Sequence, residues 1–168
     1  MNEVVLGKLK ETRAHLINEI SRLQDDNFNK RPDMNKWSIA QVCHHLILVE
    51  RSTMKVIQWG LKGKSDTNSA RKKVELILNR DKKIKAPQIV EPAEETFTVQ
   101  QIINLLKDSR EKLFALLHSI DDKSVLREKS VKHPAFGDLP LDQWVEAVYL
   151  HEQRHLEQIK EIKNVLKS

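Results

Sequence analysis

Two histidines near the C-terminus, His151 and His155, stand four residues apart within an apolar repeat. At about 100° per residue, both fall in the centre of the stripe that contains Trp144, where a helical bundle normally places Leu or Ile. A buried imidazole without a partner costs roughly 1 to 3 kcal/mol for each unsatisfied polar group. Histidines at positions i and i+4 can direct ring nitrogens to one point, so a metal ion would satisfy both rings.

A third histidine, His45, lies in an earlier amphipathic segment. The helical wheel puts it beside Val49 and Val56 on the flank of the buried stripe, while His44 falls on the solvent side. If the two helices are neighbours, His45 completes a three-nitrogen site. Three neutral histidines suit zinc or nickel, and also cobalt, manganese or iron, and leave coordination positions for water or substrate. Spacing alone also allows ordinary core histidines that bond to a carbonyl or carboxylate.

The helices that must carry these residues follow from the three-to-four spacing of apolar side chains. Ser38 with Gln41, and Thr98 with Gln101, form S/T-x-x-Q capping boxes that open the second and third helices. Proline at position 32 ends the first helix before it. The expected helices are residues 6–23, residues 39 to 60–63, residues 99–120, and residues 141 toward the C-terminus.

The stretch 62–97 is the least regular part of the chain, with a short helix expected near 74–78. It is too long for a bare loop, so we expect it to pack along the bundle. Residues 133–140 indicate a structured turn that leads into the last helix. No alternation is long enough to build a sheet. The sequence therefore predicts an all-α four-helix bundle with a long irregular connection between the second and third helices.

Composition limits the class of protein. The 168 residues fit one domain, residues 1–168, and Lys plus Arg exceed Asp plus Glu by 29 to 24. The basic runs 71–73 and 82–85 have no interleaved aromatic residues, so we expect no nucleic-acid partner. The single cysteine, Cys43, excludes an intrachain disulfide. The longest strictly apolar run, residues 46–49, is far shorter than the roughly 18 residues of a membrane span. We therefore expect a cytoplasmic protein without a membrane partner.

Two blocks of this sequence resemble the DinB/YfiT-like metalloprotein superfamily. Residues 37–46 (WSIAQVCHHL), followed by Glu50, match its W-S-x-x-[EQ]-x-x-x-H-L signature, and residues 133–137, Trp144 and residues 151–159 match its second block. The resemblance covers nearly the whole chain in order and spacing. It implies an up-down-down-up bundle with a metal site on His45, His151 and His155.

Members of that superfamily with known activity include S-transferases that use bacillithiol, mycothiol or glutathione, and a thiol-dependent maleylpyruvate isomerase. The leading hypothesis is therefore a metal-dependent S-transferase that joins a low-molecular-weight thiol to a small electrophile. One alternative is a metal-dependent hydrolase of small esters or amides. Another is a non-catalytic metal-binding or dimerising module, and all three allow a homodimer.

Other residues carry weaker signals. Glu50 could orient a ligand histidine or relay a proton, and an ion pair with an arginine explains it about as well. His133 and Phe136 could line the substrate entrance, although a turn explains them too. Arg154 could meet a carboxylate of the thiol, but its wheel position favours the surface. We expect Cys43 to be plain core packing.

Overall fold

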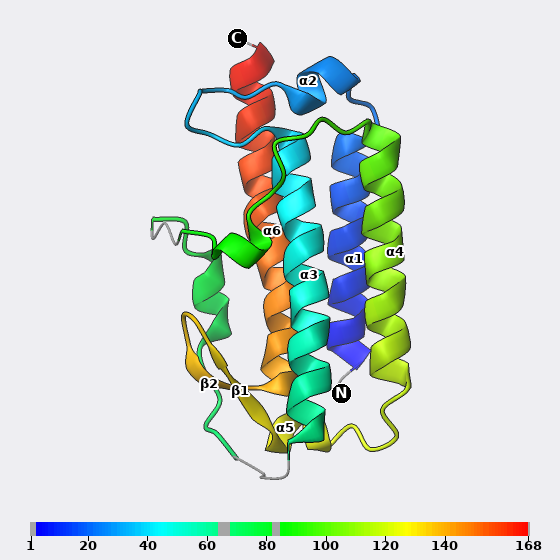
Figure 1. Cartoon of the computed structure of the whole chain (residues 1–168), viewed down its shortest axis with the longest axis vertical. Coiled ribbons are helices and arrows are strands. Elements are labelled where there is room, and N and C mark those ends of the chain that lie inside the picture. The colour runs from blue at the N-terminus through cyan, green and yellow to red at the C-terminus, as the bar shows by residue number, and fades with distance from the viewer. Residues whose placement is uncertain (1–2, 64–67, 82–84, 168) are drawn as a thin grey trace.

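Four long helices stand side by side in the computed structural model, which describes residues 3–63, 68–81 and 85–167 (Figure 1). No helix in these ranges is long and apolar enough to cross a membrane. The long helices are α1 (Glu3–Ile20), α3 (Ile39–Lys62), α4 (Val99–His118) and α6 (Leu141–Lys167). The short elements are α2 (Asp25–Asn29), η1 (Val74–Leu78), η2 (Gln88–Val90), α5 (Val125–Glu128), β1 (Ser130–His133) and β2 (Gly137–Pro140).

The colour gradient in Figure 1 shows the direction of each helix: α1 and α6 run upward, and α3 and α4 run downward. This confirms the all-α four-helix bundle and its up-down-down-up course. Around the bundle, α3 contacts α4 and α6, and α1 contacts the same two helices. Helices α3 and α6 are therefore antiparallel neighbours, which is the condition that His45 needs to meet the C-terminal histidine pair.

Local sequence signals explain where two helices begin. Ser38 and Thr98 accept hydrogen bonds from the amides of Gln41 and Gln101, whose side chains bond back to the cap amides, so both predicted capping boxes are present. Gly60 does not end α3, which continues to Lys62. The first helix spans 3–20 instead of 6–23, and the chain then turns into α2.

A layer of charge divides the two larger groups of apolar core residues, and a third, smaller group of Val74, Leu139 and Leu150 lies apart from them. Arg13, Glu50, Arg110 and Glu152, one residue from each long helix, are all buried between an upper and a lower group of apolar side chains. The upper group includes Leu16, Ile47, Leu106, Leu156 and Ile159, and the lower group includes Leu9, Ile57, Leu113, Val145 and Val148.

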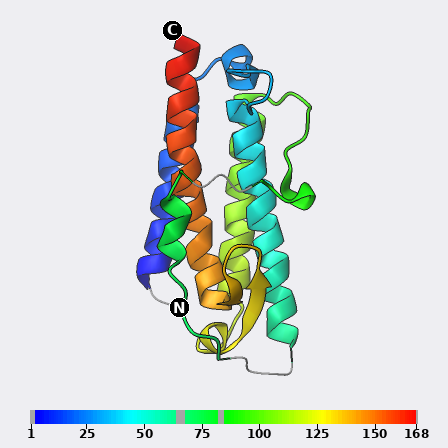
Figure 2. The same cartoon turned by 90° about the vertical axis from the view of Figure 1, so that its left-hand side faces the viewer.

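Because α3 and α4 run parallel, the chain between them must travel back along the bundle. Figure 2 shows η1 beside α6 and η2 beside α3, so the expectation that this connection packs along the bundle is confirmed for residues 68–81 and 85–98. The predicted short helix at 74–78 is present as a 3₁₀ helix. Residues 64–67 and most of the basic run 82–85, namely 82–84, lie outside the described residues.

Side chains of α6 hold the first part of the connection. Arg71 donates to Asp142 and to Glu146, each at 2.6 Å. The buried side chain of Gln143 pairs with the backbone of Lys72 through two hydrogen bonds, at 2.7 and 2.8 Å. Residues 68–81 are therefore fixed to the helix that carries two of the three candidate metal ligands.

The turn before α6 is a β-hairpin, so the expectation that the chain contains no sheet was wrong. Strands β1 and β2 pair antiparallel from Ser130 opposite Pro140 to His133 opposite Gly137. Gly137 has φ +67°, a left-handed conformation that glycine adopts without steric cost. Four-residue strands are too short to show an alternating apolar pattern, which is why the sequence indicated only a turn.

Gly60 lies where α3 approaches the start of α6, and it supplies a test of the fold. A Cβ atom there would be 2.9 Å from Leu141 Cδ2 and 3.0 Å from Val131 Cγ2. We expect Gly60→Val to lower the free energy of unfolding by about 1 to 3 kcal/mol, because a buried site would be overpacked. At Gly7 on α1, by contrast, an added Cβ atom would have no neighbour within 4 Å.

Gly7→Val is therefore the matched control, and it should change the free energy of unfolding by no more than about 0.5 kcal/mol, because valine and glycine differ little in helix propensity. Urea unfolding followed by circular dichroism measures both variants. A Gly60→Val protein as stable as the wild type would contradict the packing of α3 against Leu141 and the hairpin.

Candidate metal centre

Helices α3 and α6 bring three histidines together. Candidate ligand nitrogens of His45, His151 and His155 all lie within 4.8 Å of one another. The ring centroid of His45 is 5.1 Å from each of the other two, and those two are 4.4 Å apart. This is the one such group of potential ligands found among the described residues. The structure therefore brings together the three side chains that the sequence singled out.

Hydrogen bonds orient two of these rings. His45 Nδ1 lies 2.7 Å from the carbonyl oxygen of Val90, and His155 Nδ1 lies 2.7 Å from Oε1 of Gln158. Each Nδ1 can act only as the donor when its partner is an oxygen acceptor, so the lone pair of each neutral ring is on Nε2. Metal-ligating histidines commonly have such a partner, which fixes the tautomer and the ring orientation.

His151 forms a hydrogen bond with His155. His151 Nε2 is 3.0 Å from His155 Nε2. Since the lone pair of His155 is on Nε2, His151 donates its Nε2 proton in this arrangement. To present Nε2 to a metal ion, His151 must carry its proton on Nδ1 instead.

All three imidazoles are held neutral. Burial lowers the pKa of His45, and it lowers the pKa of His151 well below its usual value. Burial, together with the nearby His45, lowers the pKa of His155 to about 3. Only a neutral imidazole has a lone pair for a metal, so protons do not compete for these rings at neutral pH.

The η2 segment covers this group from the α3 side. Val90 contacts His45 as described, and the backbone amide of Ala93 donates to His44 Nδ1 at 3.1 Å. The His44 ring also lies 5.0 Å from the ring of Phe97. His44 is therefore partly covered by the connection and does not simply face solvent, because the helical wheel takes no account of a segment that packs on the outside of the bundle.

Glu50 lies in the buried layer of charge. Its Oε1 accepts from Arg110 Nε at 2.5 Å and its Oε2 from Arg13 Nη2 at 3.0 Å. Burial raises the pKa of the carboxyl, but the two guanidinium groups outweigh this and hold the pKa below its usual value. This is the ion pair that the sequence offered as one explanation, and it makes Glu50 a weaker base than a free carboxylate.

The residues expected at the substrate entrance lie on the hairpin and on α6. The ring of His133 packs 4.6 Å from Trp144 and 5.1 Å from Phe136, and its Nδ1 accepts from the amide of Ala135. Burial lowers the pKa of His133 to about 4. A role for His133 and Phe136 in admitting substrate stays a prediction.

Arg154 fastens the connection to α6. Its Nη1 donates to the carbonyl oxygen of Ile77 at 2.9 Å and to that of Asn79. Burial, with a contribution from Arg80, lowers the pKa of its guanidinium. Cys43 is fully buried in the upper apolar group, as expected.

The sequence alone did not reveal five groups near the site: Val90 and Gln158, which bond to two of the histidines, and Arg13, Arg110 and Glu152, which line a small cavity with His151. A backbone carbonyl such as that of Val90 has no signature in sequence. The charged residues did have a signature in the sequence, because Arg13 shares a helical face with the apolar residues Leu9 and Leu16. A charge at a core position requires a buried partner of opposite sign.

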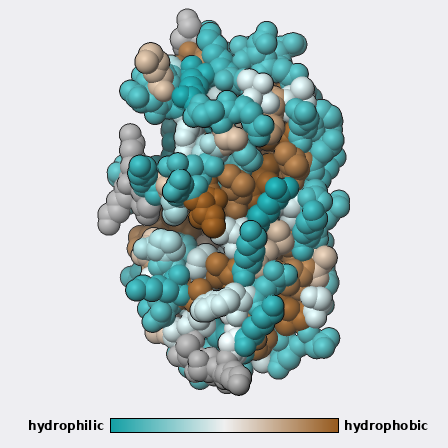
Figure 3. Space-filling model, in the orientation of Figure 1, coloured by the Kyte–Doolittle hydropathy of each residue, from teal (hydrophilic) through white to brown (hydrophobic). Residues whose placement is uncertain are grey.

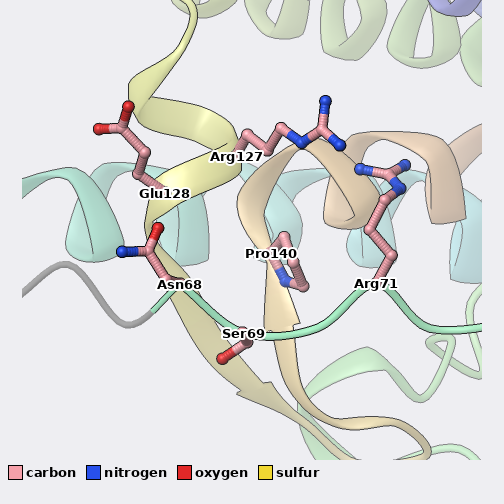
Figure 4. A pocket seen from close by; sticks show the side chains of 6 residues that line it. All are labelled: Asn68, Ser69, Arg71, Arg127, Glu128 and Pro140. Carbon is pink, nitrogen blue, oxygen red and sulfur yellow. The ribbon is translucent and has the colours of Figure 1, made fainter.

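A separate cavity of about 360 Å³ lies near α5 and the start of α6 (Figure 4). Arg71 and Arg127 extend beside it, but Glu128 also lines it and Arg71 is already paired with two carboxylates. Its mixed charge favours no particular ligand, and none of the three histidines lines it.

Comparisons with known proteins agree with this architecture. The family model of the DinB superfamily matches residues 6–159. The uncharacterised protein YuaE of Bacillus subtilis (strain 168) is 33% identical over 153 residues, covering 91% of this chain and 93% of YuaE. Two solved structures share the fold. TT2238, a four-helix bundle protein, is 19% identical with a TM-score of 0.64, covering 95% of this chain and 98% of its own.

The second is YfiT from Bacillus subtilis, described as a probable metal-dependent hydrolase with an unusual four-helix bundle topology. It is 16% identical with a TM-score of 0.69, covering 98% of this chain and 87% of its own.

The histidine cluster yields a direct binding test. We expect one Zn²⁺ or Co²⁺ per chain to raise the thermal unfolding midpoint of metal-free protein, because an ion that binds only the folded state stabilises it. His45→Ala and His151→Ala should each abolish most of that shift. The exposed His118, bonded to the carbonyl oxygen of Phe114 on α4, is the control, and His118→Ala should keep the full shift. Equal shifts in all three variants would exclude the cluster as the binding site.

Proposed function

The chain belongs to the DinB superfamily, and from this premise we propose that His45, His151 and His155 bind one divalent metal ion and that the protein is a metal-dependent enzyme. The observation that carries the proposal is the convergence of three neutral imidazoles, two of them oriented through Nδ1 by Val90 and Gln158. Zinc or nickel fits this donor set, and cobalt, manganese and iron are compatible with it.

A set of three protein ligands favours a catalytic metal site over a purely structural one. Structural zinc sites usually have four protein ligands, whereas catalytic sites keep a position open. Within residues 3–63, 68–81 and 85–167, no Cys, Asp or Glu joins the three histidines in a group close enough to share an ion. Cys43 is among the core side chains instead.

We propose a thiol-dependent S-transferase as the specific activity. A divalent ion in this site would lower the pKa of a low-molecular-weight thiol, such as bacillithiol, so that sulfur is nucleophilic at neutral pH. The thiol proton would be lost to solvent, and the thiolate would displace a leaving group such as a halide from carbon of a small electrophile: the C–S bond forms as the bond to the leaving group breaks, and that group departs with the electron pair. Such a reaction needs no separate protein base to activate the sulfur, which agrees with a site where Glu50, the base that the sequence suggested, is held by two arginines.

The surface near the histidines suggests the kind of electrophile. Next to Val90, whose carbonyl oxygen bonds to His45, Ile89 is 72% exposed. Figure 3 shows the apolar patch over η2. Exposed apolar groups beside a polar site favour a substrate that has an apolar part, since contact with it removes these side chains from water.

Hydrolysis of small esters or amides is the second candidate. The observation that favours it is the fold shared with YfiT, which is described as a probable metal-dependent hydrolase. Water would then occupy the position that the thiol takes in a transferase. The same three histidines would serve both reactions, so substrate assays must separate them.

The decisive assay combines metal, thiol and substrate. We expect zinc- or nickel-loaded protein to accelerate conjugation of bacillithiol with monobromobimane, and His151→Ala or chelation to reduce the enzymatic rate at least about 100-fold, because the activated thiol is lost. His118→Ala should keep the wild-type rate. Conjugation that is equally fast in metal-free protein would refute the transferase.

A p-nitrophenyl ester assay without thiol tests the alternative. Metal-dependent release of nitrophenol, lost in His151→Ala, would assign the hydrolase instead. If the protein binds one ion but shows no turnover in either assay, the result would support the third alternative, a non-catalytic metal-binding module.

A further inference from the structure

The four charged residues of the core form a closed ring. Arg13 binds Glu152 through Nε at 2.6 Å and Glu50 through Nη2 at 3.0 Å. Arg110 binds Glu50 through Nε at 2.5 Å and Glu152 through Nη2 at 3.0 Å. Each residue is at most 5% exposed. Two positive and two negative charges alternate around the ring, so its net charge is zero.

The remaining donors connect the ring to the backbone. Arg13 Nη1 donates to the carbonyl oxygen of Leu106 on α4, and Arg110 Nη1 donates to that of Leu9 on α1. Each acceptor lies four residues before the opposite arginine. Shifting any helix along its axis would break several of these bonds, whereas apolar side chains tolerate small displacements because their contacts are not directional.

The ring also adjoins His151. A cavity of about 10 Å³ lies among the four long helices, and this is roughly the space that one water molecule requires. It is lined by Arg13, Glu50, Arg110, Glu152, Leu46, Val49, Val148 and His151. Glu50 and Glu152 are thus the carboxylates that share a cavity with His151.

His151 differs from the other two rings in its Nδ1. Val90 and Gln158 accept the Nδ1 protons of His45 and His155. When His151 offers Nε2 to an ion, its own Nδ1 proton also needs an acceptor, because an unsatisfied buried donor is costly. Carboxylates in an adjoining cavity can supply one through a bridging water.

We propose that the Arg13–Glu50–Arg110–Glu152 ring positions His151 for metal binding. The ring holds α6 in the register that places His151 beside His45. The Nδ1–H group of His151 donates a hydrogen bond to a water in the shared cavity, and that water donates to a ring carboxylate. Its members are positioning residues, not ligands. This inference rests on the proposed metal site.

Stability alone does not explain such a ring. Replacing a buried ion-pair network with apolar residues of similar volume is often neutral or stabilising, whereas removing one charge leaves its partners buried and unpaired. The two effects can therefore be separated by variants. Glu152→Gln keeps the shape of the side chain but removes one charge. The fourfold variant Arg13→Met, Glu50→Leu, Arg110→Met, Glu152→Leu removes every charge together.

The chain offers a matched control on the same pair of helices. Lys163 on α6 forms an ion pair with Glu19 on α1, two turns beyond His155. Lys163→Met breaks an α1–α6 ion pair, as loss of the Arg13–Glu152 contact does, without touching the ring or the histidines. It should behave as the wild type in every metal measurement.

The first readout is Co²⁺ binding, followed by its visible absorption, beside urea unfolding of the metal-free proteins. We expect Glu152→Gln and the fourfold variant to bind Co²⁺ about 10- to 100-fold more weakly, the usual effect of losing groups that orient a ligand histidine. The fourfold variant should remain folded. Affinity within twofold of the wild type in either folded variant would overturn the inference.

The second readout needs no metal. Imidazole nitrogen resonances of ¹⁵N-histidine-labelled protein should move for His151 in the ring variants and stay in place in Lys163→Met. Unchanged His151 resonances would overturn the positioning role. If the wild type binds no Co²⁺ but the His151 resonances move as expected, the proposed function fails and the positioning of His151 by the ring stands.

Discussion

The packing of three imidazole rings at the contact between α3 and α6, with His45 and His155 buried and His151 half-buried, is the constraint on which the rest of the structure depends. Water is largely excluded from the two buried rings, so their polar nitrogens need partners from the protein or a ligand. Val90 and Gln158 meet that need for His45 and His155. The same burial keeps the rings neutral, which is the state that coordinates metals. Burial therefore has two consequences: the ring nitrogens need hydrogen-bond partners, and the rings stay in the neutral form that can coordinate a metal.

Much of the architecture could be predicted because its causes are local. The capping boxes at Ser38 and Thr98 and the spacing of apolar residues depend on neighbours within two turns, and the structure shows both caps where the sequence placed them. The convergence of His45 with His151 and His155 needed one further assumption, that their helices are neighbours. The family signature supplied that assumption.

What could not be predicted depends on residues far apart in the chain. Val90 acts through its backbone, whose place beside α3 follows from how the connection packs. The hairpin at 130–140 is too short for a periodic signal. Arg13 and Arg110 are separated by 97 positions, and only the assembled bundle shows that both bind Glu50 and Glu152. Long-range pairing of charge is invisible to a wheel drawn for one helix.

The wide separation of the site residues along the chain also bears on how the protein folds during synthesis. The groups of the site come from residues 45, 90, 151, 155 and 158, so its contacts span 113 positions. Contacts between distant residues form slowly, because the entropy cost of closing a long loop comes before the contacts that stabilise it. During synthesis, His45 emerges long before the rings that it must meet. The site is therefore one of the last features to mature, and a nascent chain cannot capture an ion on all three histidines until α6 has been translated.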